Sequence, residues 1–390
     1  MDIKKTGVAG SESKQDVLVK VEPNKLGLEI KITSSLGKLY YNQIVSTIDE
    51  IANKYGIANA LITVIDYGAL DYVIRARSES AILRASQEIE KKFYSERQEV
   101  EYKLRRSRLY IPGNNPYLMQ GITFYNADGI ILDLEDSVPI EEKDTARMLV
   151  SYALKNIDFA KSERMVRINS LDICGADDID AVLQYKPDVI LIPKCETEYD
   201  VKKVAEILEK TEKRFNLYGY QIKLIPIIES AKGVENAYQI ASVSDRNVSL
   251  AFGAEDYTVS LGVKKTEGED ELLFARQSIV NAAKAAGIQA SDSVYSNIEN
   301  IEGLKKSTEK SKILGFDGRG VIHPSQIDIV HSVFMPSEKE IEEAKEIIEV
   351  FNKAKENGSG VVKHKGKMID MPIMLRAMRI VSTAKTINQE

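Results

Sequence analysis

The sequence predicts an α/β protein whose main part is a (β/α)8 barrel of the TIM type, with surplus helices after it and a small α+β domain before it. From Arg105 onward, short apolar runs alternate with longer amphipathic stretches, and eight such runs can be counted. Runs that are apolar throughout are typical of parallel strands covered on both faces. Eight repeats favour a closed barrel over its rival, a doubly wound open sheet.

The eight predicted strands follow one another at fairly regular intervals along the chain. They lie at residues 109–111, 129–132, 165–168, 189–192, 224–228, 248–252, 288–290 and 321–322. Two further helices are predicted after the last strand, one at about 337–357 and one from Pro372. A barrel does not need them, so they form a separate carboxyl-terminal region.

The first segment has a different pattern, which predicts a small α+β domain. Residues 16–21, 28–33 and 60–65 alternate or run apolar as strands do. Between them, Ile44 and Ile51 mark the apolar face of one helix that ends at Gly56. A charged stretch that reads as helical then runs to Arg97, and residues 86–104 fit either a helix or a flexible linker. The predicted division of the chain is 1–97, 98–335 and 336–390.

Composition excludes several functional classes. The net charge is −6, and no lysine- and arginine-rich run with interleaved aromatic residues points to a nucleic acid. The amino terminus lacks an apolar core of signal-peptide length, and no apolar run approaches the ~20 residues that span a bilayer. Cys174 and Cys195 are too few for a disulfide framework, and we expect them to be buried or idle thiols. The expectation is a soluble cytoplasmic protein with a small-molecule substrate.

Charged residues follow five successive predicted strands. In barrels of this type the carboxyl ends of the strands carry the functional groups, because the βα loops converge there. The charged residues at these ends are Asp133, Glu135, Asp136, Arg167, Lys194, Glu229, Glu255 and Asp256. Any one of them alone would be read as a solvated loop residue, but five strand ends in succession predict a site.

The residue types at these strand ends favour a hard divalent cation. Carboxylates from separate strands, without histidine or cysteine nearby, suit Mg²⁺ better than zinc. Such an ion could bind the oxygens of an α-hydroxy or α-keto acid and polarise them. Arg167 could hold a substrate carboxylate or stabilise a developing enolate oxygen.

The three histidines are poor candidates for a general base. His323 precedes Pro324 at the eighth strand end, His331 lies inside a predicted helix, and His364 sits among lysines.

The chain from about Arg105 to its carboxyl terminus closely resembles the β subunit of bacterial citrate lyase. The motifs that carry the resemblance are RRSRLYIPG at 105–113, LDLEDSV at 132–138, KDTAR at 143–147, VRIN at 166–169, IES at 228–230, GAEDY at 253–257 and GKMIDMP at 366–372. Several separate motifs in the same order make chance improbable.

The first segment resembles another subunit of the same complex, the γ subunit or acyl carrier protein. The likeness rests on VAG at 8–10, GALD at 68–71 and RAR at 75–77. It implies a natural fusion of carrier and lyase, with a phosphoribosyl-dephospho-coenzyme A arm, a phosphopantetheine-like group, attached to a serine of the amino-terminal loop. Ser13 is the preferred position and Ser11 the reserve, whereas an ungapped alignment places Lys14 there. Free coenzyme A as the thioester carrier is the alternative.

The resemblance also implies site residues. Mg²⁺ would be held by Glu229 and Asp256, and Arg167 and Glu229 would contact the substrate. Relatives of this barrel use a catalytic aspartate on a carboxyl-terminal helical lid that often reaches a neighbouring subunit, and Asp370 matches it. The plain alternative for Asp370 is a helix N-cap before Pro372.

The implied reaction is cleavage of a citryl thioester to oxaloacetate and an acetyl thioester. The implied partner is the citrate lyase α subunit, an acyl transferase, and the chain is expected to form a homo-oligomer, a homotrimer. Two alternatives stay open from the sequence: a citramalate lyase subunit, which would yield pyruvate and an acetyl thioester, and a non-catalytic carrier or scaffold subunit.

Overall fold

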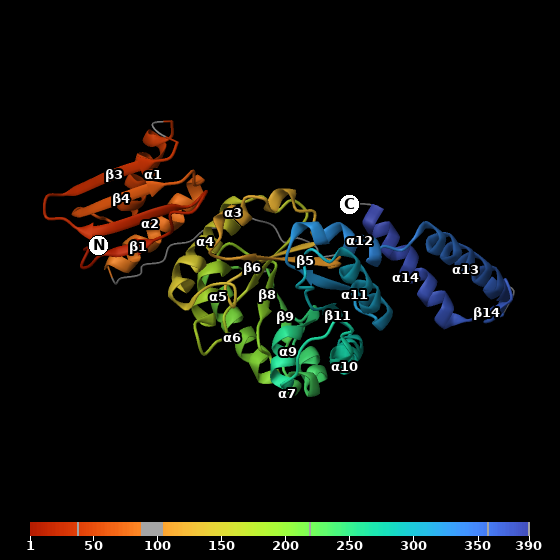
Figure 1. Ribbon diagram of the computed structural model, residues 1–390. Helices are drawn as coiled ribbons and strands as arrows, with labels where there is room; N and C mark the ends of the chain where they lie inside the picture. The colour runs from red at the N-terminus through yellow and green to blue at the C-terminus, as the bar shows by residue number, and fades with distance from the viewer. Residues whose placement is uncertain (37–38, 87–103, 218–219, 357–358, 389–390) are drawn as a thin grey trace.

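The computed structural model describes residues 1–36, 39–86, 104–217, 220–356 and 359–388, and it shows three regions along the chain (Figure 1). A small α+β domain comes first, a barrel surrounded by helices follows, and a helical hairpin ends the chain. The predicted boundary at 97/98 and most of the predicted linker lie outside the described residues. The predicted boundary at 335/336 falls in the short connection between the barrel's last helix and the hairpin.

The small domain is a four-stranded sheet with two helices. Its strands have the spatial order β1-β2-β4-β3, with β3 parallel to β4 and the other pairs antiparallel. Every second residue of β2 and β4 is buried, which is why alternation in the sequence revealed these strands. Strand β1 was not predicted because three residues are too few to show a period. The elements are β1 (Gly7–Ala9), β2 (Val17–Pro23), β3 (Leu28–Ser34), α1 (Tyr41–Lys54), β4 (Ala60–Asp66) and α2 (Asp71–Ser86).

Helix α2 joins the small domain to the barrel. It packs against β1 and β2 on one side and against barrel helix α4 (Lys143–Asn156) on the other. Its buried residues therefore include polar ones, among them Arg77 and Glu79, and it lacks the single apolar stripe of a surface helix.

The barrel is closed, and its eight strands are all parallel and lie in sequence order. The predicted TIM-type barrel is therefore confirmed. Several strands begin or end one or two residues from the predicted bounds, and β12 begins three residues earlier than predicted. In the last two strands the reason is that Asp292 ends one and Gly318 begins the other, and neither residue carries an apolar signal. The strands are β5 (Ser107–Pro112), β6 (Gly129–Asp133), β7 (Glu163–Arg167), β8 (Val189–Ile192), β9 (Lys223–Ile228), β10 (Ser249–Phe252), β11 (Gln289–Asp292) and β12 (Gly318–Val321).

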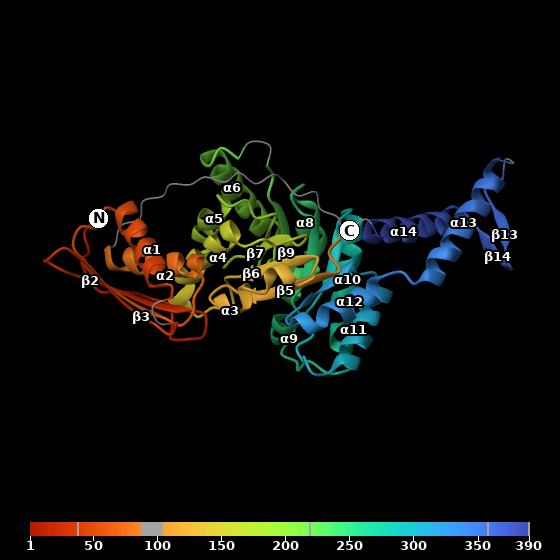
Figure 2. The same ribbon diagram turned by 90° about the horizontal axis from the view of Figure 1, so that it is seen from above.

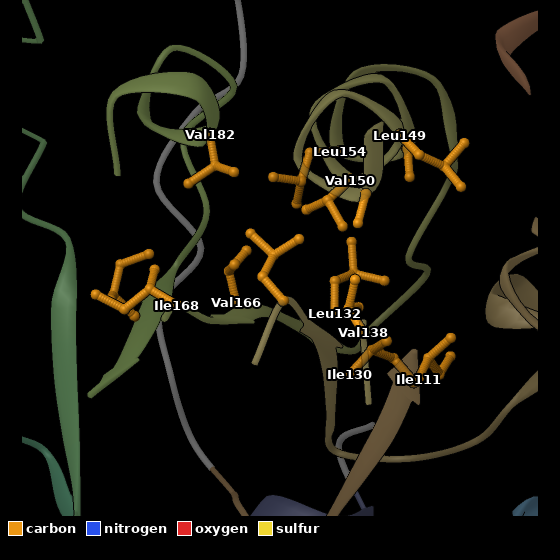
Figure 3. Close-up of a cluster of buried hydrophobic side chains, with 14 of the residues drawn as sticks. Ile111, Ile130, Leu132, Val138, Leu149, Val150, Leu154, Val166, Ile168 and Val182 are labelled. Carbon is orange, nitrogen blue, oxygen red and sulfur yellow. The ribbon is translucent and has the colours of Figure 1, made fainter. Parts of the chain in front are cut away.

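Two cores hold the barrel together. Figure 3 shows the outer one, where side chains of β5, β6 and β7 such as Leu132 and Val166 meet Val150 of α4 and Val182 of α5. A separate cluster made only of strand residues, including Ile131, fills the barrel interior. The helices outside the strands are α3 (Pro116–Met119), α4, α5 (Gly175–Leu183), α6 (Glu198–Arg214), α7 (Ala231–Glu235), α8 (Ala237–Ser242), α9 (Ala254–Leu261), α10 (Leu273–Ala285), α11 (Ile301–Leu314) and α12 (Ile327–Phe334).

The carboxyl-terminal region is a hairpin of two helices that projects from the barrel on the side opposite the small domain, as both views show (Figures 1 and 2). Its core is Phe351, Ile369 and Met374. The two-stranded ribbon at its tip was not predicted, because each strand has only three residues. The elements are α13 (Glu338–Glu356), β13 (Val362–His364), β14 (Lys367–Ile369) and α14 (Met371–Asn388). In the part of the chain that the structure describes, no helix is long and apolar enough to cross a membrane.

Candidate active site

A pocket of about 440 Å³ opens at the carboxyl ends of the barrel strands. It brings together three residues that the sequence placed in a site, Arg167 from the end of β7, Glu229 after β9, and Asp256 in the first turn of α9. Its lining also includes Arg108, Tyr110, Pro112, Asp133, Asp136, Ser137, Phe252, Gly253, Glu255, Asp292 and Ser293.

Arg167 is clamped by carboxylates on both edges of its guanidinium group. Its Nε and Nη2 donate to the two oxygens of Asp133 at 2.6 and 2.7 Å, and its Nη1 lies 2.8 Å from Glu135 Oε2. Burial by itself would lower the pKa of Arg167, but the charge of Asp133 and the hydrogen bonds to it hold that pKa well above its usual value. The arginine is therefore a permanent cation in the pocket wall.

Tyr110 is a neighbour of Arg167 that the sequence analysis missed. The Arg167 guanidinium carbon lies 5.2 Å from the centre of the Tyr110 ring, a cation–π distance. Arg108, Tyr110 and Pro112 alternate along β5, and all three line the pocket. The period of two along a strand is the signal that could have found them. The rule for strand ends does not reach Tyr110, because that residue lies within β5.

Glu229 is a buried carboxyl group, 5% exposed, at the centre of this arrangement. Burial, and then the charges of Glu135 and Asp256, raise the pKa of Glu229 to about 8. The backbone N–H of Lys194 donates to Glu229 Oε1 at 2.5 Å, which opposes the rise. Gly253 lies so close that a Cβ there would meet Glu229 Oε2 at 2.4 Å, so a glycine at this position makes room for the carboxyl group.

Lys194 crosses the rim of the pocket beside Arg167. Its Nζ lies 2.8 Å from Glu135 and 3.5 Å from Asp136, and its backbone has a positive φ of 51°. The hydrogen bond to Glu135 is the main reason that the pKa of Lys194 is raised. Lys194 and Arg167 therefore share Glu135, while Lys194 also positions Glu229 through its backbone.

The donor set suits Mg²⁺ better than a softer metal. Among the described residues, no three His, Cys, Asp or Glu side chains form a ready metal-binding group. Mg²⁺ usually takes only one or two protein carboxylates and keeps waters or substrate oxygens as its other ligands. Glu229 and Asp256, which line one pocket and repel each other, fit that requirement.

Asp370 lies outside this pocket. It sits between β14 and α14, in the projecting hairpin, and its Oδ1 accepts a hydrogen bond from the backbone N–H of Ile373 at 3.3 Å. That contact is the one a helix N-cap makes. Within a single chain, the structure does not bring Asp370 to Arg167, Glu229 and Asp256.

Ser13 also lies away from the pocket, in the loop between β1 and β2, where its side chain is exposed. Ser11, two residues earlier, donates a hydrogen bond from its hydroxyl to Asp16 Oδ2 at 2.9 Å. Lys14 points toward the barrel, with its Nζ 5.7 Å from the centre of the Tyr117 ring. Of the two serines, Ser13 is therefore the more accessible.

The cysteines and histidines take no part in the pocket lining. Cys195 is fully buried, and burial raises the pKa of its thiol. His331 Nε2 lies 2.8 Å from the hydroxyl of Ser107, at the amino end of β5 and thus at the opposite end of the barrel.

Comparison with known proteins identifies the family. The model described as HpcH/HpaI aldolase/citrate lyase matches residues 106–324. The chain belongs to this family. Its relatives include carbon–carbon lyases, and the prediction of an enzyme of that class is confirmed.

Individual relatives also include lyases. A citrate lyase subunit beta of Leuconostoc mesenteroides subsp. cremoris is 42% identical over 283 residues, which cover 72% of this chain and 94% of the relative. A mitochondrial citramalyl-CoA lyase of Homo sapiens is 32% identical over 335 residues, covering 81% and 97%. A crystal structure of protein CitE from Mycobacterium tuberculosis, in complex with magnesium, acetoacetate and coenzyme A, has a TM-score of 0.59 and 26% identity, covering 72% of this chain and 98% of that one.

The small domain matches a different family. The acyl carrier model described as malonate decarboxylase delta subunit (MdcD) covers residues 4–85. The chain therefore joins a carrier-like domain to a domain like the citrate lyase β subunit.

We predict that Glu229 makes the stability of the metal-free protein depend on pH. Because the folded state raises the pKa of Glu229 to about 8, the protonated carboxyl group is favoured on folding. The stabilisation that this protonated group gives to the folded state is complete below pH 4.5. It is lost between pH 4.5 and about pH 8, at about 1.4 kcal/mol of unfolding free energy per pH unit. Chemical unfolding of the wild type and Glu229→Gln between pH 5 and pH 8 measures the difference. Parallel curves for the two proteins would contradict the assignment.

Proposed function

We propose that this chain is a Mg²⁺-dependent citryl-thioester lyase that carries its own acyl carrier domain and works in a citrate lyase complex. The observation that supports this most is that Arg167, Glu229 and Asp256 line one pocket at the mouth of the barrel. In this proposal residues 1–97 are the carrier, 98–335 the lyase barrel and 336–390 its lid. The substrates would be a citryl thioester in one direction, and oxaloacetate with an acetyl thioester in the other.

Glu229 and Asp256 would hold the metal ion. When bound there, Mg²⁺ supplies Lewis-acid stabilisation for the hydroxyl and carboxylate oxygens of the substrate. Glu229 and Asp256 would hold the ion in their deprotonated form, as metal ligands do. The raised pKa of Glu229 favours its protonated form in the metal-free pocket.

Arg167 would bind the carboxylate end of the substrate. Asp133 occupies the Nε and Nη2 edge of the guanidinium group, so the Nη1 side, which faces Glu135 and Asp136, is the side available to a ligand. A substrate carboxylate there would compete with Glu135, which Lys194 also holds. Arg167 and Lys194 would stabilise the negative charge on the substrate hydroxyl oxygen as its proton passes to solvent. That oxygen becomes the ketone oxygen of oxaloacetate when the carbon–carbon bond breaks, and the electron pair of the broken bond stays on the thioester as its enolate.

The assignment of Glu229 and Asp256 as metal ligands predicts how substitutions change Mg²⁺ binding and turnover. Glu229→Gln and Asp256→Asn should abolish both Mg²⁺-induced thermal stabilisation and cleavage of citryl-CoA. Arg167→Lys should still bind Mg²⁺ but lose about 10²-fold in turnover, since lysine cannot form the two-pronged contact with Asp133 that fixes the cation in the pocket wall. Glu255→Gln is the matched control, because Glu255 lines the same pocket but pairs with Lys265 at 2.8 Å. Retained Mg²⁺ binding in both carboxylate variants would overturn the site.

Asp370 would protonate the thioester enolate that cleavage leaves behind. Because Asp370 lies in the projecting hairpin, it would have to act in the site of a neighbouring subunit, in a homo-oligomer such as a homotrimer. We expect Asp370→Asn to lower turnover at least tenfold, within the range that positioned acids contribute. Mixed oligomers of Asp370→Asn and Glu229→Gln chains should regain part of the activity. Full turnover in Asp370→Asn alone would show that the residue only caps α14.

Ser13 would carry the phosphoribosyl-dephospho-coenzyme A arm, as in the γ subunit of citrate lyase. The exposed side chain of Ser13 and the match of residues 4–85 to an acyl carrier model support this. Intact-mass measurement after coexpression with the attachment enzymes should show one added arm in the wild type and Ser11→Ala, and none in Ser13→Ala. An arm that survives in Ser13→Ala would move the attachment to Ser11. No arm in the wild type would favour free coenzyme A thioesters.

A citramalate lyase subunit is the second candidate, and the 32% identity to a citramalyl-CoA lyase favours it. In either case the acyl transferase partner would be the α subunit of the complex, and the expected location is the cytoplasm. A non-catalytic scaffold predicts instead that the strand-end carboxylates can be replaced without loss of lyase turnover.

A further inference from the structure

The carrier-like domain rests on the side of the barrel where the pocket opens. Arg77 Nη2 of α2 donates to the backbone oxygen of Asn114 at 3.1 Å, and Lys14 faces the ring of Tyr117. Asn114 and Tyr117 belong to the loop and helix that directly follow β5, so they lie at the carboxyl end of the barrel. Pro112, two residues before Asn114, lines the pocket itself.

The buried side chain of Arg77 links the loop that contains Ser13 to the loop that follows β5. Besides its contact with Asn114, Arg77 binds both carboxylate oxygens of Asp16 at 3.1 Å. Asp16 in turn accepts a hydrogen bond from Ser11, and its backbone N–H donates to the oxygen of Ser13 at 3.1 Å. An ion pair that is 3% exposed on both sides therefore holds the Ser13 loop against the loop that follows β5.

Arg84 forms a second link, between the other end of α2 and the start of α4. Its Nε donates to Asp144 Oδ2 at 2.6 Å, and its Nη2 donates to the backbone oxygen of Glu141 at 3.1 Å. Its Nη1 donates to the backbone oxygen of Val8 in β1 at 2.6 Å. One side chain thus joins the sheet of the small domain to the loop and helix that follow β6.

Between these two links, the contact between α2 and α4 buries the carboxylate of Glu79, which has neighbours in both domains. Glu79 of α2 is 3% exposed and binds Lys54 and Tyr55 of its own domain. Tyr152 of α4 lies beside it: burial first, then the charge of Glu79 and hydrogen bonding to it, raise the pKa of Tyr152. A buried carboxylate is costly unless partners satisfy it. Here one of the partners comes from the barrel, so the contact is specific and not merely apolar.

From these contacts we infer that the carrier domain serves the barrel of its own chain, and that Arg84 and Asp144 are positioning residues that keep it docked along α4, beside the end of the barrel where the pocket opens. The inference rests on the proposed function, in which Ser13 bears the thioester arm and the barrel cleaves it. A carrier held in this way presents its arm at a high effective concentration to one site. A carrier that exchanged between chains would not need these contacts.

A charge swap tests this directly in the full chain with its arm attached. Arg84→Asp and Asp144→Arg should each slow single-turnover cleavage of the carrier-bound citryl thioester about tenfold, because a misplaced reactant loses the benefit of proximity. Both should cleave free citryl-CoA at the wild-type rate, since neither residue lines the active-site pocket. The double variant Arg84→Asp/Asp144→Arg restores opposite charges and should regain carrier-bound turnover.

A second measurement tests the use of the chain's own barrel. When Ser13→Ala and Glu229→Gln chains are mixed, we expect no recovery of carrier-bound turnover above that of the separate variants. Recovery to about half of wild-type activity, or single charge variants with unchanged carrier-bound turnover, would overturn the inference. Equal loss on free citryl-CoA, or a double variant as slow as the single ones, would also overturn it. Failure of the proposed function is distinguishable, because then the wild type itself would cleave neither thioester.

Discussion

The site depends on one electrostatic constraint: closure of the barrel brings more carboxylates to its mouth than the neighbouring cations neutralise. Arg167 and Lys194 are engaged by Asp133, Glu135 and Asp136. Glu229 is buried beside Glu135 and Asp256, and burial together with these two charges raises its pKa to about 8, which favours its protonated form. A divalent cation between Glu229 and Asp256 would relieve the same repulsion. If Glu229 and Asp256 hold a metal ion as proposed, the ion and a proton would compete for the carboxylate of Glu229.

The backbone around the pocket serves this arrangement. Glycine at position 253 lets β10 approach Glu229 within a distance that any side chain would block. The left-handed backbone of Lys194 directs its N–H toward Glu229 while its side chain turns to Glu135. The position of Glu229 thus depends on the backbone at Gly253 and Lys194. For this reason the charge of a residue alone does not reveal its role in the pocket.

Much of this could be predicted from the sequence, and the failures have physical reasons. The eight apolar runs predicted the barrel because parallel strands are buried on both faces, and the strand-end rule predicted a group of charged residues at its mouth. The resemblance to the citrate lyase β subunit then narrowed that group to Arg167, Glu229 and Asp256. Tyr110 was missed because it lies within a strand, where its role depends on which face turns inward. The true end of β11 was missed because Asp292, a buried polar residue, follows the apolar part of that strand.

The long-range contacts were beyond the reach of the sequence. Nothing in the spacing of Arg84 and Asp144 indicates that the two side chains meet across sixty residues. Likewise, the motif that contains Asp370 does not reveal that its hairpin projects from the barrel, and only packing against a second copy would complete the catalytic role proposed for it.

The most direct test of the account is to offer the wild-type chain citryl and citramalyl thioesters side by side, with and without Mg²⁺. The account predicts Mg²⁺-dependent release of oxaloacetate from the citryl thioester, at a higher kcat/KM than the release of pyruvate from the citramalyl thioester. Faster cleavage of the citramalyl thioester would reassign the substrate. Cleavage that proceeds equally well without Mg²⁺ would contradict the central role given to Glu229 and Asp256.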